Sequence, residues 1–306
     1  MDTNQTHSLL KAKLLQLTSG TGHYPTAIQG LSLYRQNESN QTVCSFYRPF
    51  VAVVLQGCKH SLIGSEAYRY GEGYCLINGI DIPSVNQVVG ATAEAPFLSV
   101  SLDLDGALIR QLASEVFGAE KMDDAPMKGM AVAPTDPEVA DAFWRLIKLL
   151  DSPTQMPALA ALMIREIHYR LLTGAQGAHL RSINTQGTHN HQIFRALARM
   201  RQQFRESVEI DGLAHEVGMA ASTFRRHFKT VTRMSPLQYQ KHLRLYEAQR
   251  LMLTENIDAT RASYAVGYAS ATQFSREYKR LFGKSPKRSV TLLRQTTAPM
   301  NGAARN

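Results

Sequence analysis

The chain has 306 residues, of which 44% are hydrophobic and 19% charged, and its formal net charge at pH 7 is +9. This length allows two or three packed domains, and the composition excludes a disordered or membrane-embedded chain. The first twenty residues contain no apolar run of signal-peptide length, and no later run approaches a membrane span. We therefore expect a cytoplasmic protein with no membrane contact.

The positive charge is unevenly distributed along the chain. Residues 187–306 contain 20 Lys and Arg against 8 Asp and Glu, a balance of +12, whereas residues 1–186 contain 14 against 17, a balance of −3. A basic segment attracts nucleic-acid phosphates, although the same charge also suits a solubilising surface. The carboxy-terminal part is thus the candidate for nucleic-acid binding.

The amino-terminal part, residues 1–103, reads as β-structure after one short helix within residues 9–18. From Gly30 onward, β-rich runs recur at intervals of about 8–12 residues, which is typical of a small antiparallel sandwich or barrel. Glycines separate these runs, namely Gly57, Gly64, Gly71, Gly73, Gly79 and Gly90. The mouth of such a domain can hold a small molecule.

Several side chains in this β-rich part suit a ligand pocket. Tyrosines offer ring surface with a hydroxyl tip, and a cationic side chain can hold an anionic group, although tyrosines are also ordinary residues of half-buried strands. His60 is a weaker candidate, because it is equally an ordinary strand-end side chain. The candidate ligand-binding residues are Tyr47, Arg48, Lys59, His60, Tyr68 and Tyr70.

The cysteines form no CxxC pair and are odd in number, which fits unpaired thiols in a reducing compartment. Cys58 directly precedes Lys59, and a nearby cation makes a thiol more nucleophilic. We hypothesise that Cys44 or Cys58 senses an electrophile or oxidant; the alternative is a simple buried cysteine. His60 and Glu66 stand alone where a metal enzyme needs converging ligands, so we expect no metal and no cofactor.

Residues 104–186 change to a helical period. Helices are predicted over 104–118, 136–151 and 157–174, with a loop at 123–135. The third helix carries a stripe that is either core or a self-association face, formed by Leu159, Leu162, Met163, Glu166, Ile167, Arg170 and Leu171. The polar stretch 174–190 is interpreted as a flexible joint, and 191–206 as the next helix.

The carboxy-terminal part, residues 187–296, contains one helical unit twice, followed by a tail at 297–306. Counting from Phe224, aromatic, lysine and Ser-Pro positions follow at offsets of 4, 5 and 11–12, and the same offsets recur from Phe274. A glycine precedes each aromatic pair, Gly218 or Gly267, and a small residue lies four positions before each glycine. Glycine suits the left-handed turn between two helices, and the aromatic pair packs the second helix on the first. The repeat therefore predicts two helix-turn-helix units.

The second helix of each unit has a polar, basic face that suits a DNA major groove. We expect base contacts from Ser222, Arg225, Arg226, Thr272, Ser275 and Arg276, and phosphate contacts from Lys229, Lys279 and Arg280. The alternative for each arginine is a solvated or phosphate-only side chain. A proline-started helix over 236–253, about 27 Å long at 1.5 Å per residue, would separate the two reading helices by nearly one helical repeat of DNA.

These motifs resemble the tandem helix-turn-helix domain of the AraC/XylS family of transcription regulators. Ala220 departs from the family at a usual capping serine, Arg233 at a usual glycine, and Ser289-Val290 at a usual tyrosine, whereas Ser270 and Gln273 form a predicted capping box. Residues 48–57 and 63–83 are similar to the cupin-like amino-terminal domain of some AraC-type regulators. The resemblance implies an α+β chain with a sensor barrel, a middle region that dimerises, and a DNA-binding domain.

The predicted function is therefore a non-enzymatic, sequence-specific transcription regulator, with activation as the expected mode. Its expected partners are double-stranded promoter DNA, a small-molecule effector and a second copy in a homodimer, and contact with RNA polymerase is compatible with this class. Two alternatives stay open: a cupin-type, metal-independent enzyme tethered to DNA, and an architectural DNA-binding protein without a ligand.

Overall fold

The computed structural model describes residues 3–39, 43–118, 127–185 and 187–297. It divides into two compact units, one formed by residues 1–197 with 211–235 and the other by residues 198–210 with 236–306. The first unit holds the β-rich part, the middle helices and the first helix-turn-helix; the second unit holds the second one. The predicted domain boundaries at 103, 186 and 296 stay predictions, and the predicted tail lies outside the described residues except for Thr297.

The β-rich part folds as two antiparallel sheets. The first sheet has the order β1-β2-β9-β4-β7-β10, and the second β3-β8-β5-β6. The strands are β1 Gly22–Pro25, β2 Leu31–Gln36, β3 Val43–Tyr47, β4 Phe50–Gln56, β5 Cys58–Ile63, β6 Glu66–Gly71, β7 Tyr74–Asn78, β8 Ile82–Val89, β9 Phe97–Asp103 and β10 Met130–Pro134. The predicted α+β fold with a cupin-like β domain is confirmed, and its strands form two sheets rather than one closed barrel.

The main hydrophobic core lies on the outer face of the six-stranded sheet, not between the sheets. Successive strand residues point to opposite faces. Along β9, Leu98, Val100 and Leu102 belong to this core, whereas Ser99 and Ser101 line a cavity on the other face. The strand sequences therefore separate a stabilising face from a cavity-lining face.

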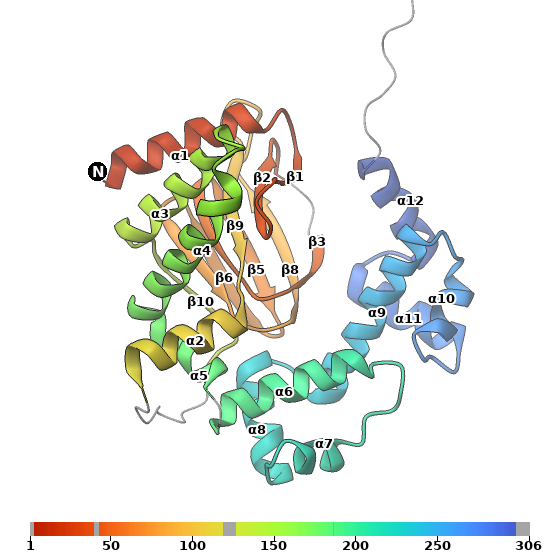
Figure 1. The fold of residues 1–306 in the computed structure, drawn as a ribbon. Coiled ribbons are helices and arrows are strands. Elements are labelled where there is room, and N and C mark those ends of the chain that lie inside the picture. Colours follow the sequence, from red (N-terminus) through yellow and green to blue (C-terminus); the bar gives the residue numbers. More distant parts are fainter. Residues whose placement is uncertain (1–2, 40–42, 119–126, 186, 298–306) are drawn as a thin grey trace, which may run out of the picture. The chain divides into compact units, whose positions relative to one another are not determined.

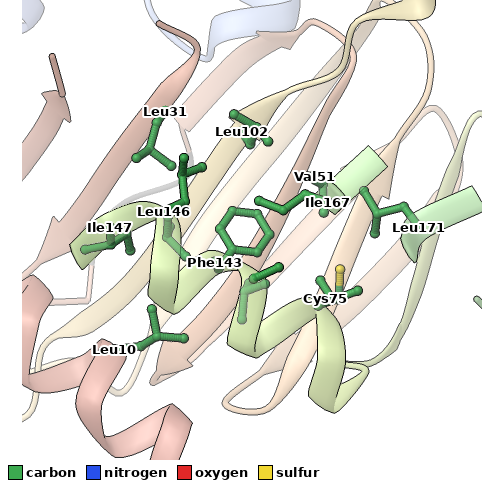
Figure 2. Packing of buried hydrophobic residues seen from close by; sticks show 14 of the residues in the cluster. Leu10, Leu31, Val51, Cys75, Leu102, Phe143, Leu146, Ile147, Ile167 and Leu171 are labelled. Carbon is green, nitrogen blue, oxygen red and sulfur yellow. The ribbon is translucent and has the colours of Figure 1, made fainter. Parts of the chain in front are cut away.

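Three helices cover the apolar face of this sheet (Figure 1). They are α1 Thr3–Leu17, α3 Pro137–Lys148 and α4 Met156–Thr173. Figure 2 shows Phe143 of α3 packed beside Val51, with Leu10 of α1 and Ile167 of α4 in the same cluster. Phe143 and Ile167 have no exposed surface, so this contact fixes the helices to the sheet.

Local sequence signals set the ends of these helices. Asp105 accepts from the amides of Ala107 and Leu108 at the start of α2 Gly106–Phe117, and Asp136 caps α3 before its first-turn proline. The three predicted middle helices are confirmed, with a short 3-10 turn, η1 Leu149–Asp151, closing the second.

Two predictions for the middle region were wrong. The predicted loop 123–135 contains β10, which pairs with β7; residues 123–126 lie outside the described residues. The predicted joint 174–190 contains α5 Gly177–Asn184. Leu180 and Ile183 of this helix are buried in the tertiary fold, which the polar residues around them in the sequence do not indicate. Within the predicted stripe of α4, Leu162 is 63% exposed, since it lies about 140° around the helix from Ile167 at 100° per residue. Leu162 is therefore not part of the core, and the alternative of a self-association face stays a prediction.

The helix-turn-helix units follow. The remaining helices are α6 His189–Gln202, α7 Ile210–Glu216, α8 Ala221–Thr232, α9 Pro236–Thr254, α10 Ala259–Ala265, α11 Ala271–Phe282 and α12 Pro286–Thr297. Both α9 and α12 begin at the proline that the sequence places at the first helical position. Arg244 of α9 donates to the carbonyls of Phe204, Arg205, Glu206 and Gly267, which ties the loop before α7 to the second helix-turn-helix.

Candidate functional site

The two helix-turn-helix units have the same internal geometry. In α7–α8, the amide of Met219 donates to the carbonyl of Ala214 at 2.9 Å across the turn, and in α10–α11 the amide of Tyr268 donates to Ser263 at 3.0 Å. The glycine in each turn has a positive φ, 79° at Gly218 and 88° at Gly267. The predicted left-handed glycine turn is confirmed in both copies.

The aromatic pairs hold each second helix in place. Phe224 and Phe228 are fully buried with ring centroids 5.5 Å apart, and Phe274 and Tyr278 repeat this distance. Burying these pairs on one side leaves the opposite side of α8 and α11 to solvent. All nine predicted DNA-contacting side chains lie on exposed positions: Ser222, Arg225, Arg226, Lys229, Thr272, Ser275, Arg276, Lys279 and Arg280.

The electrostatic surroundings of the two exposed faces differ. Arg225 of α8 forms an ion pair with Asp211 of α7 at 2.5 Å, so DNA contact through Arg225 competes with a weak surface pair. In α11, Glu277 accepts from Lys241 at 2.9 Å and from the hydroxyl of Tyr268 at 2.8 Å. Partial burial favours the neutral acid, but these hydrogen bonds prevail and lower the pKa of Glu277. Glu277 thus connects α11 to α9 and to the turn before α11, and within the described part of the chain Arg276 forms no ion pair.

The sequence departs from the family pattern at both ends of α8, and the corresponding ends of α11 show the difference. Ala220 precedes α8 without a side-chain cap, whereas Ser270 accepts from the amide of Gln273 at 3.3 Å. The Gln273 side chain donates to Glu277 rather than back to the Ser270 amide, so only half of the predicted capping box forms. Arg233 ends α8 in the left-handed conformation with φ 62°, where Gly283 ends α11 with φ 72°.

A cavity of about 460 Å³ lies between the two sheets of the β domain. Its six-stranded wall has small residues at the inward positions, Ser32, Ala52, Ser99 and Ser101. These four are neighbours across β2, β9 and β4, and Ser101 pairs with both Ser32 and Ala52. Small side chains at adjacent inward positions leave the space that larger ones would fill.

The opposite wall carries polar and aromatic groups in one hydrogen-bonded network. The hydroxyls of Tyr47 and Ser61 both donate to the side-chain oxygen of Asn86 at 2.6 Å, and Ser61 also bonds the hydroxyl of Tyr70 at 2.8 Å. Lys59 lies directly across from Tyr70 in the β5–β6 ladder. This network fixes the polar wall before any ligand arrives.

Three charged residues line the cavity: Lys59 on its polar wall, and the exposed Arg48 and Asp103. The ammonium of Lys59 lies 5.6 Å from the ring centroids of both Tyr34 and Tyr47, and among the described residues no carboxylate forms an ion pair with it. Burial disfavours the charged form, but the phenol oxygens of Tyr47 and Tyr70 outweigh burial and raise the pKa of Lys59. For Tyr34 and Tyr70, burial is the main cause that raises the pKa, so both phenols are neutral near pH 7. Lys59 is therefore a cation without an anionic partner.

The structure brings together four of the six predicted ligand residues. Tyr47, Arg48, Lys59 and Tyr70 line the cavity, with Arg48 exposed at its edge. His60 does not line it, because its strand neighbour Lys59 does and successive residues point to opposite faces. Tyr68 shares the face of Tyr70 but lies two residues nearer the hairpin turn, opposite Ser61, where the ammonium of Lys128 lies 6.0 Å from its ring centroid. The sequence analysis missed the serine wall, Tyr34 and Asn86, although the alternation of serine and aliphatic residues along β9 indicates the inward face.

The cysteines stand apart from this cavity. Cys58 precedes Lys59 on β5 and so faces away from it, and neither Cys58 nor Cys44 lines the cavity. Both are half-buried and neither forms a disulfide within the described part of the chain. Sensing by either stays a hypothesis, and full effector response in a triple Cys→Ser variant would contradict it. Cys75 is buried, which raises the pKa of its thiol to about 12.

Two further findings concern the described residues only. They contain no group of three or more His, Cys, Asp or Glu side chains that could hold a metal ion. None of their helices combines the length and apolar character that crossing a bilayer requires.

A β domain with a cationic cavity, followed by two helix-turn-helix units, defines the class of DNA-binding transcription regulators with a sensor domain. Residues 27–179 match the model of the AraC-type transcriptional regulator N-terminus, and residues 213–290 match a helix-turn-helix domain. The chain belongs to the family of AraC-type transcriptional regulators.

Similar proteins span most of the chain. It is 27% identical to the HTH-type transcriptional regulator ExsA of Pseudomonas aeruginosa over 206 residues, covering 67% of this chain and 70% of ExsA. It is 24% identical to the virulence regulon transcriptional activator VirF of Yersinia enterocolitica, covering 78% and 87%. Among solved structures, ToxT of Vibrio cholerae with bound unsaturated fatty acid has a TM-score of 0.58 at 9% identity, covering 94% of this chain and all of ToxT. The ToxT likeness establishes a shared fold.

Proposed function

We propose that the chain is a cytoplasmic, non-enzymatic transcription activator whose β domain binds a small anionic effector, most simply a carboxylate with an apolar or aromatic body. The observation that carries this proposal is the unpaired ammonium of Lys59 between two tyrosine rings in the cavity. Lys59 is half-buried, and withdrawing a cation from water even in part is unfavourable unless it is paired, so an anionic ligand completes the site. Solved ToxT structures contain an unsaturated fatty acid and a naphthyl-substituted butenoic acid, both carboxylic acids.

The effector experiment compares carboxylates with matched amides. We expect fatty acids or aryl-alkenoic acids to raise the melting temperature of the full chain, and the corresponding amides to have no effect. Lys59→Met should abolish this shift, because it removes the charge and keeps the length of the side chain. Arg48→Met, which removes a cation at the exposed edge, is the matched control and should retain most of the shift. An unchanged melting-temperature shift in Lys59→Met would refute the proposal that Lys59 binds the carboxylate.

The β5–β6 hairpin offers a route from the cavity to the first helix-turn-helix. Lys59 and Tyr70 lie at the open end of this hairpin, and Glu66 lies at its turn. The Glu66 carboxylate forms ion pairs with Lys128 and with Arg233, which ends α8. Nearby, the amide of Gly129 donates to the carbonyl of Val231 in α8 at 2.9 Å. A ligand that moves Lys59 thus acts on the same hairpin that contacts the first DNA-reading unit.

The coupling experiment removes the charge at the hairpin turn. Burial of Glu66 disfavours its ionised form, but Lys128 and Arg233 prevail and lower the pKa of this carboxyl, so Glu66→Gln removes a charge that is present at neutral pH. We expect Glu66→Gln to bind the effector normally while the effector changes its operator affinity less than in the wild type. Glu72→Gln, at the far end of β6, is the control. Full coupling in Glu66→Gln would exclude this route.

Homodimerisation and contact with RNA polymerase are part of the proposal. On α4, Leu162 is 63% exposed and Tyr169 is 43% exposed, and exposed apolar groups of this size suit a self-association face. Leu162→Glu should shift the chain to the monomer in sedimentation experiments, whereas Thr173→Glu, near the exposed end of the same helix, should not. An unchanged sedimentation coefficient in both variants would place the dimer contact elsewhere.

A further inference from the structure

A second cavity lies on the other face of strand β7. Leu76 lines the cavity between the sheets, whereas its neighbours Cys75 and Ile77 line a separate cavity of about 260 Å³. The second cavity extends between β7, the end of β10, the start of α3 and the segment after α4. One strand therefore separates two spaces, and the second is not part of the proposed effector site.

The charged groups around the second cavity already have partners. Arg170 forms ion pairs with Glu166 at 2.7 Å and with Glu138 at 2.5 Å. The carboxylate of Asp136 accepts from the amide of Glu138 at 2.8 Å as the cap of α3. Cys75 is neutral, because burial raises the pKa of its thiol to about 12. This cavity thus has no charge available for an ionic ligand.

Two uncharged polar side chains at the same cavity lack partners within the described part of the chain. Both the oxygen and the nitrogen of the Gln176 amide are shielded from solvent and form no hydrogen bond, and the same holds for the hydroxyl of Thr135. Shielded polar groups are normally hydrogen-bonded, because leaving them unpaired is unfavourable. Gln176 precedes α5 but does not cap it through its side chain, so its amide has no structural role in that helix.

We propose that this cavity binds a small uncharged molecule that carries a carboxamide or lactam group on an apolar body. An amide presents one donor and one acceptor side by side, which match the acceptor and donor of Gln176, and Thr135 can complete the set. The apolar side chains of Ile77, Val139 and Leu171 would cover the rest of the ligand. The cavity volume of about 260 Å³ is large enough for a small molecule such as benzamide. A carboxylate is excluded by the absence of a free cation.

The first test uses benzamide, with benzoate as the charged control, on the full-length protein. Binding is followed by saturation-transfer NMR. We expect benzamide to bind and benzoate not to compete, and we expect Gln176→Leu and Thr135→Val to weaken benzamide binding at least tenfold and threefold, respectively. Lys59→Met, which changes only the cavity between the sheets, should leave benzamide binding unchanged. Loss of benzamide binding in Lys59→Met would mean that benzamide occupies the other cavity, and would overturn the proposal.

The second test reads the cavity directly and does not depend on the folding of the Gln176 variant. In a Cys44→Ser, Cys58→Ser background, Cys75 is the remaining thiol, and its slow modification by methyl methanethiosulfonate reports access to the cavity. Saturating benzamide should slow this modification at least fivefold, and benzoate should not. Equal modification rates with and without benzamide would show that the cavity takes up water only, and would refute the proposed ligand class. Both tests follow an uncharged ligand, whereas the proposed effector is an anion held by Lys59. Failure of benzamide to bind would therefore leave the proposed anionic effector unaffected.

Discussion

At the scale of single residues, Arg233 and Gly283 hold the same position in the two copies of the repeat. Both adopt the left-handed conformation, with φ 62° and 72°, which costs a non-glycine residue roughly 1–2 kcal/mol. Arg233 therefore keeps a strained backbone while its side chain forms an ion pair with Glu66. The side-chain contact compensates for a conformation that the second copy reaches with glycine.

A pair of variants separates these two effects. Arg233→Gly and Arg233→Ala both remove the ion pair, but only the glycine variant also relieves the backbone. We expect Arg233→Gly to be about 1 kcal/mol more stable than Arg233→Ala in urea unfolding of the full chain. Gly283→Ala, the reverse change in the second copy, should lose a similar amount. Equal stabilities of the two Arg233 variants would mean that the turn relaxes when the arginine is absent.

The exposed arginines and lysines of the reading helices should act differently on DNA. Arg225→Ala and Arg276→Ala should each cost about 1–3 kcal/mol of operator binding and relax the base preference at one position. Lys229→Ala should weaken binding to all sequences alike and reduce its salt dependence. Binding-site selection followed by sequencing measures both effects. If both arginine variants kept their base preferences, these side chains would contact phosphate only.

At the scale of elements, the turns of the two helix-turn-helix units differ in how tightly they are packed. A Cβ atom at Gly267 would lie 2.2 Å from the carbonyl oxygen of Arg205, whereas one at Gly218 would meet only a side-chain nitrogen of Gln192 at 3.5 Å. Both positions also have a positive φ. The turn before α11 therefore tolerates no side chain, and the turn before α8 excludes one only through backbone strain.

We expect Gly218→Ala to destabilise the chain by about 1 kcal/mol and Gly267→Ala by about 3 kcal/mol or more, because the second variant adds a backbone clash to the strain. Thermal unfolding followed by circular dichroism measures the difference. Similar losses for both variants would indicate that the loop containing Arg205 moves away at little cost.

Helices α3 and α4 are joined by ion pairs at their exposed edge. Glu166 accepts from Arg145 at 2.7 Å and pairs with Arg170, and the hydrogen bond from Arg145 is the main cause that lowers the pKa of Glu166 to about 2. Since the folded pKa lies below the unfolded value, this carboxylate stabilises the fold above about pH 4.5 and loses its effect as the pH falls towards 2.

Glu166→Gln should therefore lower the free energy of unfolding by about 1–2 kcal/mol at pH 7, after allowance for solvent screening. The difference between the variant and the wild type should shrink progressively below about pH 4.5. Urea unfolding at pH 7, 5 and 3.5 tests this dependence, and Glu115→Gln, at a single exposed pair with Arg165, is the control. A difference that is constant over this range would assign the effect to packing rather than charge.

The elements that could be predicted from sequence are those specified by nearby residues. The repeated turn, its buried aromatic pairs and the proline-started helices depend on residues within one or two helical turns of each other, so their pattern is local. Strand β10 depends on pairing with β7, more than fifty residues earlier, and α5 depends on burial of Leu180 and Ile183. Non-local contacts of this kind leave little trace in the local sequence pattern.

The cavity residues likewise fall into those that the local sequence indicates and those that depend on the tertiary fold. Tyr47, Lys59 and Tyr70 are recognisable by side-chain chemistry, but the serine wall is recognisable only once strand alternation assigns Ser99 and Ser101 to the inward face. The prediction for His60 was wrong for the same reason, since its side chain lies on the other face of β5. Tyr68 lies on the same face as Tyr70 but nearer the hairpin turn, which side-chain chemistry alone does not reveal.

At the scale of the whole molecule, the predicted mode of DNA binding stays a prediction. The helix α9 has 19 residues, about 28 Å at 1.5 Å per residue, and it lies between the two helix-turn-helix motifs in the sequence. If it keeps the reading helices one DNA turn apart, inserting 5 base pairs between the two half-operators should reduce affinity at least tenfold, and inserting 10 should do so less. Fluorescence anisotropy with the three operators measures this. Equal affinities would show that the units bind independently.

The two faces of the six-stranded sheet also bear on how such a regulator acquires new specificities. Its outward aliphatic side chains pack under α1, α3 and α4, whereas its inward serines and alanine contribute little to that core. Exchanging Ser32, Ser99 or Ser101 for other small side chains therefore changes the shape of the cavity without destabilising the hydrophobic core. Because one face of the sheet forms the core and the other the cavity, the domain is a suitable starting point for engineering biosensors. Natural selection can change the inducer by the same substitutions.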